Sequence, residues 1–167
     1  MKNICLHFQV HLPFKLRTYR FFDIGTDHYY YDDFLNKSTL LRVAKNSYLP
    51  MNTILLELIK KHKGKFKVSF SISGSAIEQF ERYTPEVIES FQNLAKTGKV
   101  EFLAQPYGHS LAAIKSEEEF CEQVEIHSNK ILELFGKTPK TFHNTHFIYS
   151  DYIGEMVLNM GYKGMLV

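Results

Sequence analysis

Apolar and polar residues alternate with a period of two in short stretches of the chain. In residues 65–73, for example, Val68, Phe70 and Ile72 alternate with serines. This period is typical of a β-strand whose two faces differ in polarity. The apolar segments predict five strands, at residues 3–10, 65–73, 100–105, 141–145 and 162–167.

The longer stretches between these segments predict helices. Residues 39–61 have helical apolar spacing, and we expect two helices there, the second capped by Ser47 with Pro50 in its first turn. Further helices are predicted at 84–97, 116–135 and 150–161. Their expected caps are Thr84, Ser116 and Ser150, with Glu119 completing a capping box, and Gly98, Gly136 and Gly161 are expected to end them.

Strands and helices therefore alternate, which predicts a parallel sheet covered by helices in an α/β fold. The sequence of 167 residues ends inside the apolar segment GYKGMLV, with no helix after it to cover that strand. We expect residues 1–167 to be the first part of an incomplete seven-stranded (β/α) barrel. A complete open sheet of five strands is the alternative.

The composition excludes several classes of protein. The chain is 44% hydrophobic and 23% charged, its net charge is +2, and no run of basic residues calls for a nucleic acid or a membrane surface as partner. No segment reaches the roughly 20 apolar residues of a membrane span. Cys5 and Cys121 match no metal spacing, and without a leader they predict reduced, buried thiols in a cytoplasmic protein.

Aromatic residues are frequent, at 14% of the chain, and many of them lie between Phe14 and Phe34. One interpretation is a long ordered loop packed on the core. Another is a platform on which sugar rings stack, because loops on a rigid scaffold often carry function.

Polar residues gather where the predicted strands end, which is where (β/α) barrels place their chemistry. Five of the eight histidines are found there, namely His7, His11, His109, His143 and His146. Other polar residues at these ends are Gln9, Ser73, Ser75, Glu101, Gln105, Tyr107 and Asn144. This convergence predicts one concave polar site.

Each of these residues also has a structural interpretation, since a single histidine is more often a hydrogen-bonded structural residue than a ligand. His143 and His146 differ in parity, so both face the interior only if the strand has ended before residue 146. His7, His11, His109 and His146 could together hold a hydrolytic metal ion such as zinc, although no aspartate lies beside them.

Three segments carry a resemblance to a known family: LHFQVHLPF, GKVEFLAQPYGHSL and FHNTHFIYSD. In this order they resemble the N-terminal catalytic domain of glycoside hydrolase family 57, which comprises α-amylase-like and 4-α-glucanotransferase-like enzymes related in fold to polysaccharide deacetylases. The family's His-Gln-Pro motif corresponds to His11-Leu12-Pro13. Its Gly-x-Val-Glu signature corresponds to Gly98-Lys99-Val100-Glu101.

The third motif departs from the family pattern. Relatives usually read Arg-Asn-Thr-Glu, with the glutamate as nucleophile, whereas this chain reads His143-Asn144-Thr145-His146. His146 thus stands at the nucleophile position, and the resemblance implies an aspartate acid beyond residue 167. A retaining glycosidase needs a carboxylate about 5.5 Å from its acid, so impaired catalysis is expected.

The resemblance implies a domain that acts on or binds α-glucans without a cofactor and without a bound metal. His11, Glu101, Tyr107, His109 and His143 are the expected substrate-binding residues, with His146 at the catalytic position. Two alternatives stay open: a non-catalytic carbohydrate-binding or regulatory homologue, and a metal-dependent deacetylase-like hydrolase.

Overall fold

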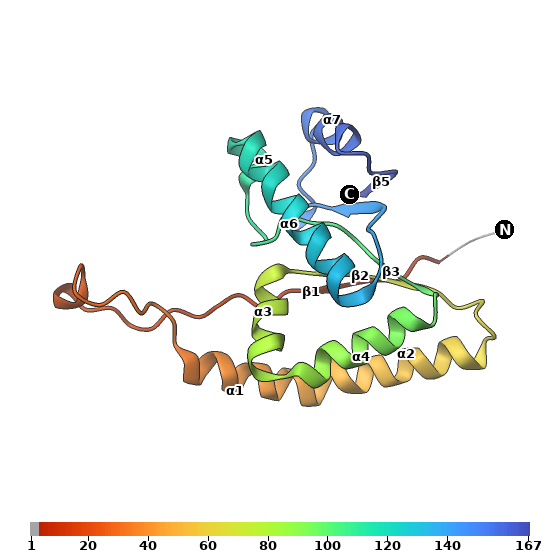
Figure 1. Ribbon diagram of the computed structural model, residues 1–167, viewed down its shortest axis with the longest axis horizontal. Coiled ribbons are helices and arrows are strands. Elements are labelled where there is room, and N and C mark those ends of the chain that lie inside the picture. Colours follow the sequence, from red (N-terminus) through yellow and green to blue (C-terminus); the bar gives the residue numbers. More distant parts are fainter. Residues whose placement is uncertain (1–3) are drawn as a thin grey trace.

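Parallel strands in chain order form the centre of the molecule. In the computed structural model, which describes residues 4–167, β1 (His7–Val10), β2 (Val68–Ile72) and β3 (Val100–Phe102) form one parallel sheet in the order β1-β2-β3 (Figure 1). β4 (Thr141–His143) pairs in parallel with β5 (Gly164–Leu166), and a parallel bridge between Ala104 and Phe142 connects the two sheets. The predicted α/β fold is confirmed; residue 3 of the first predicted strand lies outside the described residues.

The first long helical segment differs from its prediction. α1 (Asp33–Val43) continues through a π-helical turn, η2 (Ala44–Tyr48), into α2 (Leu49–Lys61), and the Leu49 N–H bonds to the Ala44 carbonyl. The prediction of a new helix capped by Ser47 is wrong. Pro50 has no N–H and its ring would clash with the carbonyl one turn earlier, and the wider π turn accommodates both effects without ending the helix.

The later helices begin after the predicted cap residues, but the predicted capping box is wrong, because the Ser116 N–H donates to the Ala112 carbonyl and the Glu119 carboxylate accepts from Gln123 instead. α6 (Glu117–Phe135) begins at Ser116, whose hydroxyl accepts from the Glu119 N–H at 3.2 Å, and ends at the left-handed Gly136. α7 (Asp151–Asn159) begins at Ser150 in the same way. α4 (Pro85–Lys96) follows Thr84, although the threonine hydroxyl makes no cap hydrogen bond. α3 (Gly74–Tyr83), α5 (Ala112–Lys115), η1 (Phe21–Asp23) and η3 (Thr145–Phe147) were not predicted.

One face of the sheet is apolar and the other is polar. Phe70 and Phe102 point to the helices, where Phe102 stacks on Phe135 of α6 with ring centroids 4.3 Å apart. The serines and histidines between them point to the opposite face. His7 on β1 and His143 on β4 meet on that face with ring centroids 5.4 Å apart. Two strands separate them, so a flat sheet would hold them about 14 Å apart. The sheet is therefore curved around its polar face, as a barrel wall is.

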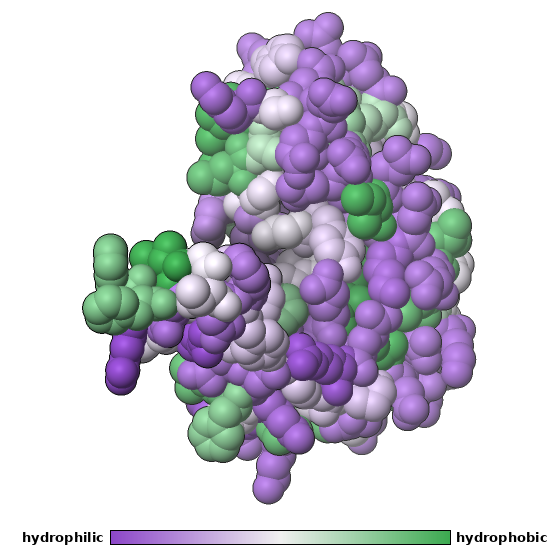
Figure 2. All heavy atoms as spheres, turned by 60° about the vertical axis from the view of Figure 1, so that its left-hand side comes forward, coloured by the Kyte–Doolittle hydropathy of each residue, from purple (hydrophilic) through white to green (hydrophobic). Residues whose placement is uncertain are grey.

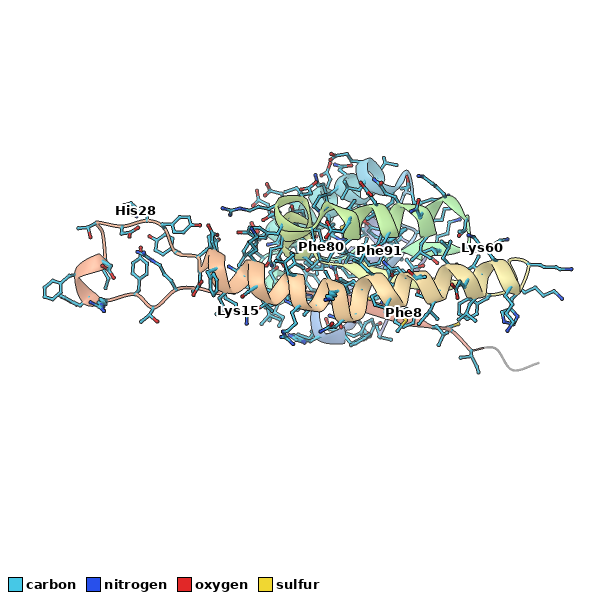
Figure 3. All side chains as sticks on the ribbon, turned by 90° about the horizontal axis from the view of Figure 1, so that it is seen from below. Phe8, Lys15, His28, Lys60, Phe80 and Phe91 are labelled. Atoms are coloured by element: carbon cyan, nitrogen blue, oxygen red, sulfur yellow. The ribbon has the colours of Figure 1, made fainter. Side chains whose placement is uncertain are left out.

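Residues 14–32 form an arm that projects from the body (Figure 1). An antiparallel bridge between Leu16 and Tyr31 closes it, and the buried Asn36 side chain holds its base by bonding both backbone groups of Lys15. Figure 3 shows Lys15 where the arm meets α1 and His28 far out along the arm. Hydrophobic residues gather at its end (Figure 2), where Phe21 and Phe22 are 81% and 85% exposed. The interpretation of this segment as a loop packed on the core is wrong.

The cysteine prediction was partly wrong. Both thiols are free, but Cys5, which precedes β1, is exposed, and Cys121 on α6 is half-buried at the edge of a hydrophobic cluster. Within residues 4–167, no helix is long and apolar enough to cross a membrane.

Candidate functional site

Five imidazoles lie on the concave polar face of the sheet. His7 and His143 face each other across it, and beyond them His11 stacks on His109 with ring centroids 4.2 Å apart. His146 lies edge-on to His109, with centroids 5.2 Å apart. The structure thus brings together the five histidines that the sequence placed at strand ends. His11, His109 and His146 meet because the carboxyl ends of parallel strands lie at one edge of the sheet. The prediction that His7 lies at such an end is wrong, because His7 is the first residue of β1 and reaches His143 across the curved face.

Neighbouring polar side chains orient three of these rings. His7 lies between the Ser69 and Ser71 hydroxyls, each 3.2 Å from one of its ring nitrogens. The Ser73 hydroxyl lies 2.9 Å from His11 Nδ1, and Ser73 also caps α3 by accepting from the Ala76 N–H. The Gln9 amide nitrogen donates to His109 Nε2 at 3.4 Å. The sequence placed Gln9 and Ser73 at strand ends, but did not show that they hold imidazoles.

His109 and His146 both have left-handed backbones, with φ of 54° and 52°. This region is uncommon for residues that carry a Cβ, and such conformations concentrate at functional sites. β4 ends at His143, so the turn that follows carries His146 to the same face as His143. His143 and His146 can therefore both face the interior, because the strand has ended before residue 146.

Burial keeps the imidazoles neutral. Desolvation, with smaller contributions from His11 and His146, lowers the pKa of His109 to about 4. Desolvation and then the charges of His7 and His109 lower the pKa of His143 to about 4. Burial also lowers the pKa of His7 and His11. At neutral pH these four rings present hydrogen-bonding groups without charge.

Two neighbouring polar residues on the same face, His143 and Gln105, are fully buried. His143 is 0% and Gln105 is 1% exposed, and the bridge between Ala104 and Phe142 places them side by side on the polar face. Within residues 4–167, neither ring nitrogen of His143 and neither amide atom of Gln105 has a hydrogen-bond partner. The polar face therefore keeps hydrogen-bonding capacity that the core around it does not use.

Glu101 does not join the imidazoles. It lies in the middle of β3, level with Ser69 and His7, and its carboxylate accepts from the Thr141 hydroxyl at 2.7 Å. The prediction that it lies at the carboxyl end of a strand is wrong, because Glu101 is the second residue of β3, whose start at Val100 agrees with the predicted strand. Glu101 and Gln105 are four positions apart, which is about 13 Å along an extended chain. It lines a hollow of about 640 Å³ at the opposite end of the sheet, together with Lys65, Lys67 and Lys99.

Tyr107 is oriented by α3. Its hydroxyl donates to Glu78 at 2.8 Å, and its ring covers Gly74 so closely that a Cβ there would come within 2.5 Å of it. Burial, followed by the hydrogen bond to Glu78, raises the pKa of Tyr107. The ring thus forms a wall beside α3 instead of stacking on the imidazoles.

No group of three or more His, Cys, Asp or Glu side chains within residues 4–167 is arranged to hold a metal ion. The metal-dependent alternative therefore gains no ligand set from this part of the chain.

The fold matches those of solved enzymes named for glucan chemistry. A 4-α-glucanotransferase from Thermococcus litoralis aligns with 98% of this chain and 22% of its own, at 18% identity and a TM-score of 0.74. The α-amylase AmyC from Thermotoga maritima aligns with 98% of this chain and 39% of its own, at 14% identity and a TM-score of 0.71. The class is thus an α/β domain with the fold of these enzymes.

Sequence comparison gives the family. Residues 5–167 match the model of Glycosyl hydrolase family 57. The chain is 36% identical over 168 residues to a protein of Methanocaldococcus jannaschii named "Putative alpha-amylase", covering 97% of this chain and 35% of that protein. It therefore spans about a third of the length of this relative. The chain belongs to glycosyl hydrolase family 57, and the resemblance noted in its motifs is confirmed.

Proposed function

We propose that the imidazole-lined end of the sheet binds an α-glucan, and that His146 at the nucleophile position impairs retaining hydrolysis. The observation that carries this proposal is the position of His146. Its ring contacts His109 edge-on in the cluster, so an imidazole, and not a carboxylate, would meet the ligand at that point.

The chemistry of the retaining reaction explains the expected impairment. The reaction passes through a covalent ester between the sugar and a carboxylate, with an oxocarbenium-like transition state. A neutral imidazole supplies neither the charge that stabilises this state nor an equivalent leaving group, and an imidazolium would repel the developing cation.

Binding of a neutral sugar fits the electrostatics of the cluster. His11, His109 and His143 offer uncharged donors and acceptors at neutral pH, because burial lowers the pKa of each. The 36%-identical relative is named a putative α-amylase, and two solved structures with this fold are named an α-amylase and a 4-α-glucanotransferase, which supports an α-glucan as the ligand. Tyr107 forms a side wall of this proposed site, whereas Glu101 supports β4 through Thr141.

A carbohydrate-binding protein without turnover is the second candidate, and the same histidine favours it. Both candidates predict binding of maltopentaose to the full-length protein, measured by calorimetry, and weaker binding by His11→Ala and His109→Ala. The absence of binding by the wild-type protein would overturn both.

Hydrolysis separates the two candidates. Maltopentaose cleavage is expected to be absent or slow in the wild-type protein and to rise in His146→Glu, with His28→Glu on the arm as a control. Normal turnover by the wild type through a covalent glycosyl intermediate would contradict the assignment of His146. Undetectable cleavage by both proteins, together with tight binding, would favour the binding protein.

A further inference from the structure

The loop that carries His109 is clamped from α6. Gln123 Oε1 accepts from the Gly108 N–H at 3.2 Å and from the Ser110 hydroxyl at 2.9 Å. These two residues flank His109 in sequence, so one amide oxygen holds both sides of it. The loop is also closed internally by the His109 N–H, which bonds to the Pro106 carbonyl at 3.0 Å.

A carboxylate one turn earlier on α6 determines which way the Gln123 amide faces. Gln123 Nε2 donates to Glu119 Oε1 at 2.6 Å. An ionised carboxylate can only accept, so it requires the NH₂ end of the amide. The carbonyl end must then face the loop, where two donors need an acceptor. Glu119 and Gln123 are four residues apart, which is the spacing of neighbours on a helix surface.

The loop held by Gln123 places His109 in an unfavourable backbone conformation. His109 has a left-handed backbone, and its ring must contact His11, His146 and Gln9 at once. A loop released from α6 can relax to an ordinary backbone conformation and carry the ring away from the other two imidazoles.

We propose that Gln123, oriented by Glu119, is a positioning residue that holds His109 in the glucan-binding cluster. This inference rests on the proposed function. It adds a pair of residues on α6 that do not themselves face the cluster and that determine where one of its rings lies.

A reciprocal exchange tests the orientation. Gln123→Glu keeps acceptors for the loop but removes the donor to Glu119 and sets two carboxylates side by side. Maltopentaose affinity of the full-length protein should fall about tenfold, as expected for one net hydrogen bond. In the double variant Glu119→Gln/Gln123→Glu, the new amide at 119 donates to the new carboxylate at 123, and affinity should recover to within about twofold.

The exchange conserves composition and net charge. A recovery of maltopentaose affinity in the double variant would therefore be due to the restored hydrogen bonds between positions 119, 123 and the loop, and not to a general effect on the helix. A double variant that binds as weakly as the single one, or a single variant that binds normally, would overturn the proposal.

A second measurement does not require glucan. In Gln123→Met the loop should open and hydrate His109, so its pKa should rise from about 4 toward the ordinary 6.5, followed by NMR of the imidazole Hε1 signal. Gln92→Met is the matched control, since Gln92 is also half-buried and donates from α4 to the Leu134 carbonyl, away from the loop.

The two measurements distinguish the clamp from the proposed function. If the wild type binds maltopentaose and His109→Ala weakens binding, but Gln123→Met changes neither affinity nor the His109 titration, the clamp fails and the function stands. If the wild type does not bind, the function fails, and the His109 titration still decides the clamp.

Discussion

The rings of His109 and His146 meet edge to face with centroids 5.2 Å apart, and both residues have left-handed backbones. They follow two adjacent strands, β3 and β4, so the loops after these strands converge at one edge of the sheet. Two uncommon backbone conformations at one contact indicate that the position of the rings is maintained against local preference.

His146→Gly tests this local strain. Glycine adopts φ near 52° at no steric cost, so the substitution should raise the free energy of unfolding by about 1 kcal/mol. It should also weaken maltopentaose binding, since the ring is lost. Urea unfolding and calorimetry measure the two effects. His28→Gly, on the exposed arm, is the control, and a loss of stability in His146→Gly equal to that of the control would contradict the prediction.

The buried His127 should make stability depend on pH. Its Nε2–H donates to the Ile72 carbonyl at 2.7 Å, and burial lowers its pKa to about 4. The unfolded chain, with a pKa near 6.5, therefore takes up the proton first as the pH falls. The contribution of the neutral ring to the free energy of unfolding is fully present above pH 6.5. It falls by about 3 kcal/mol as the pH is lowered from 6.5 to 4.

His127→Gln separates this contribution from those of other groups. Its amide can still donate to the Ile72 carbonyl but takes up no proton, so the fall in unfolding free energy between pH 6.5 and 4 should be smaller by about 3 kcal/mol. Chemical unfolding across this range measures it. If the free energy of unfolding of the variant depends on pH as steeply as that of the wild type, groups other than His127 cause the dependence.

Asn36 is predicted to hold the arm in place. Its side chain is 2% exposed and bonds the N–H and the carbonyl of Lys15 at 2.7 and 3.2 Å. Asn36→Ala should leave the Lys15 N–H unpaired and remove one of two hydrogen bonds to the Lys15 carbonyl, which also accepts from the Asp32 N–H, and should lower the free energy of unfolding by about 2 kcal/mol. Hydrogen exchange should become faster in residues 14–32 and stay unchanged in β2. Asn46→Ala, at an exposed position on the same helical segment, should change neither.

Glu101→Gln should leave maltopentaose affinity within about twofold of wild type, because position 101 lies roughly 13 Å along β3 before Gln105, at the end of the strand away from His11, His109 and His146. The amide oxygen can still accept from Thr141, so stability should also change little. Calorimetry checks the affinity, and a loss of tenfold or more would return Glu101 to the ligand site.

Much of this site follows from a simple rule of sheet geometry. Alternation in residues 65–73 identified which side chains share a face, and parallel order placed the histidine-rich ends together. The level of Glu101 was predicted incorrectly, although the predicted strand begins at the observed residue, Val100. Alternation gives the face of a residue, and the pairing with Ser69 of β2 shows that Glu101 lies near the amino end of β3 and not at its carboxyl end.

Other features had no signal in the sequence pattern. The left-handed backbones of His109 and His146 depend on tertiary contacts, and glycine does not mark either position. Gln123 lies on a helix and looks like any exposed polar residue until the loop is placed against it. The aromatic content of residues 14–34 suggested burial, but the rings pack mainly on one another, as Tyr19 does on Tyr30.

The π-helical turn at Ala44–Tyr48 determines how α1 is rotated about the helix axis relative to α2. Each residue of an α-helix advances the chain by about 100° around the axis. Deleting one residue there, with Pro50 replaced by alanine, would let a regular helix form and would rotate α1 by about that angle against α2. Asn36 would turn away from Lys15, and the aromatic hairpin would point in a new direction. Two codon changes within a helix would thus redirect a surface more than ten residues away without altering any residue of that surface.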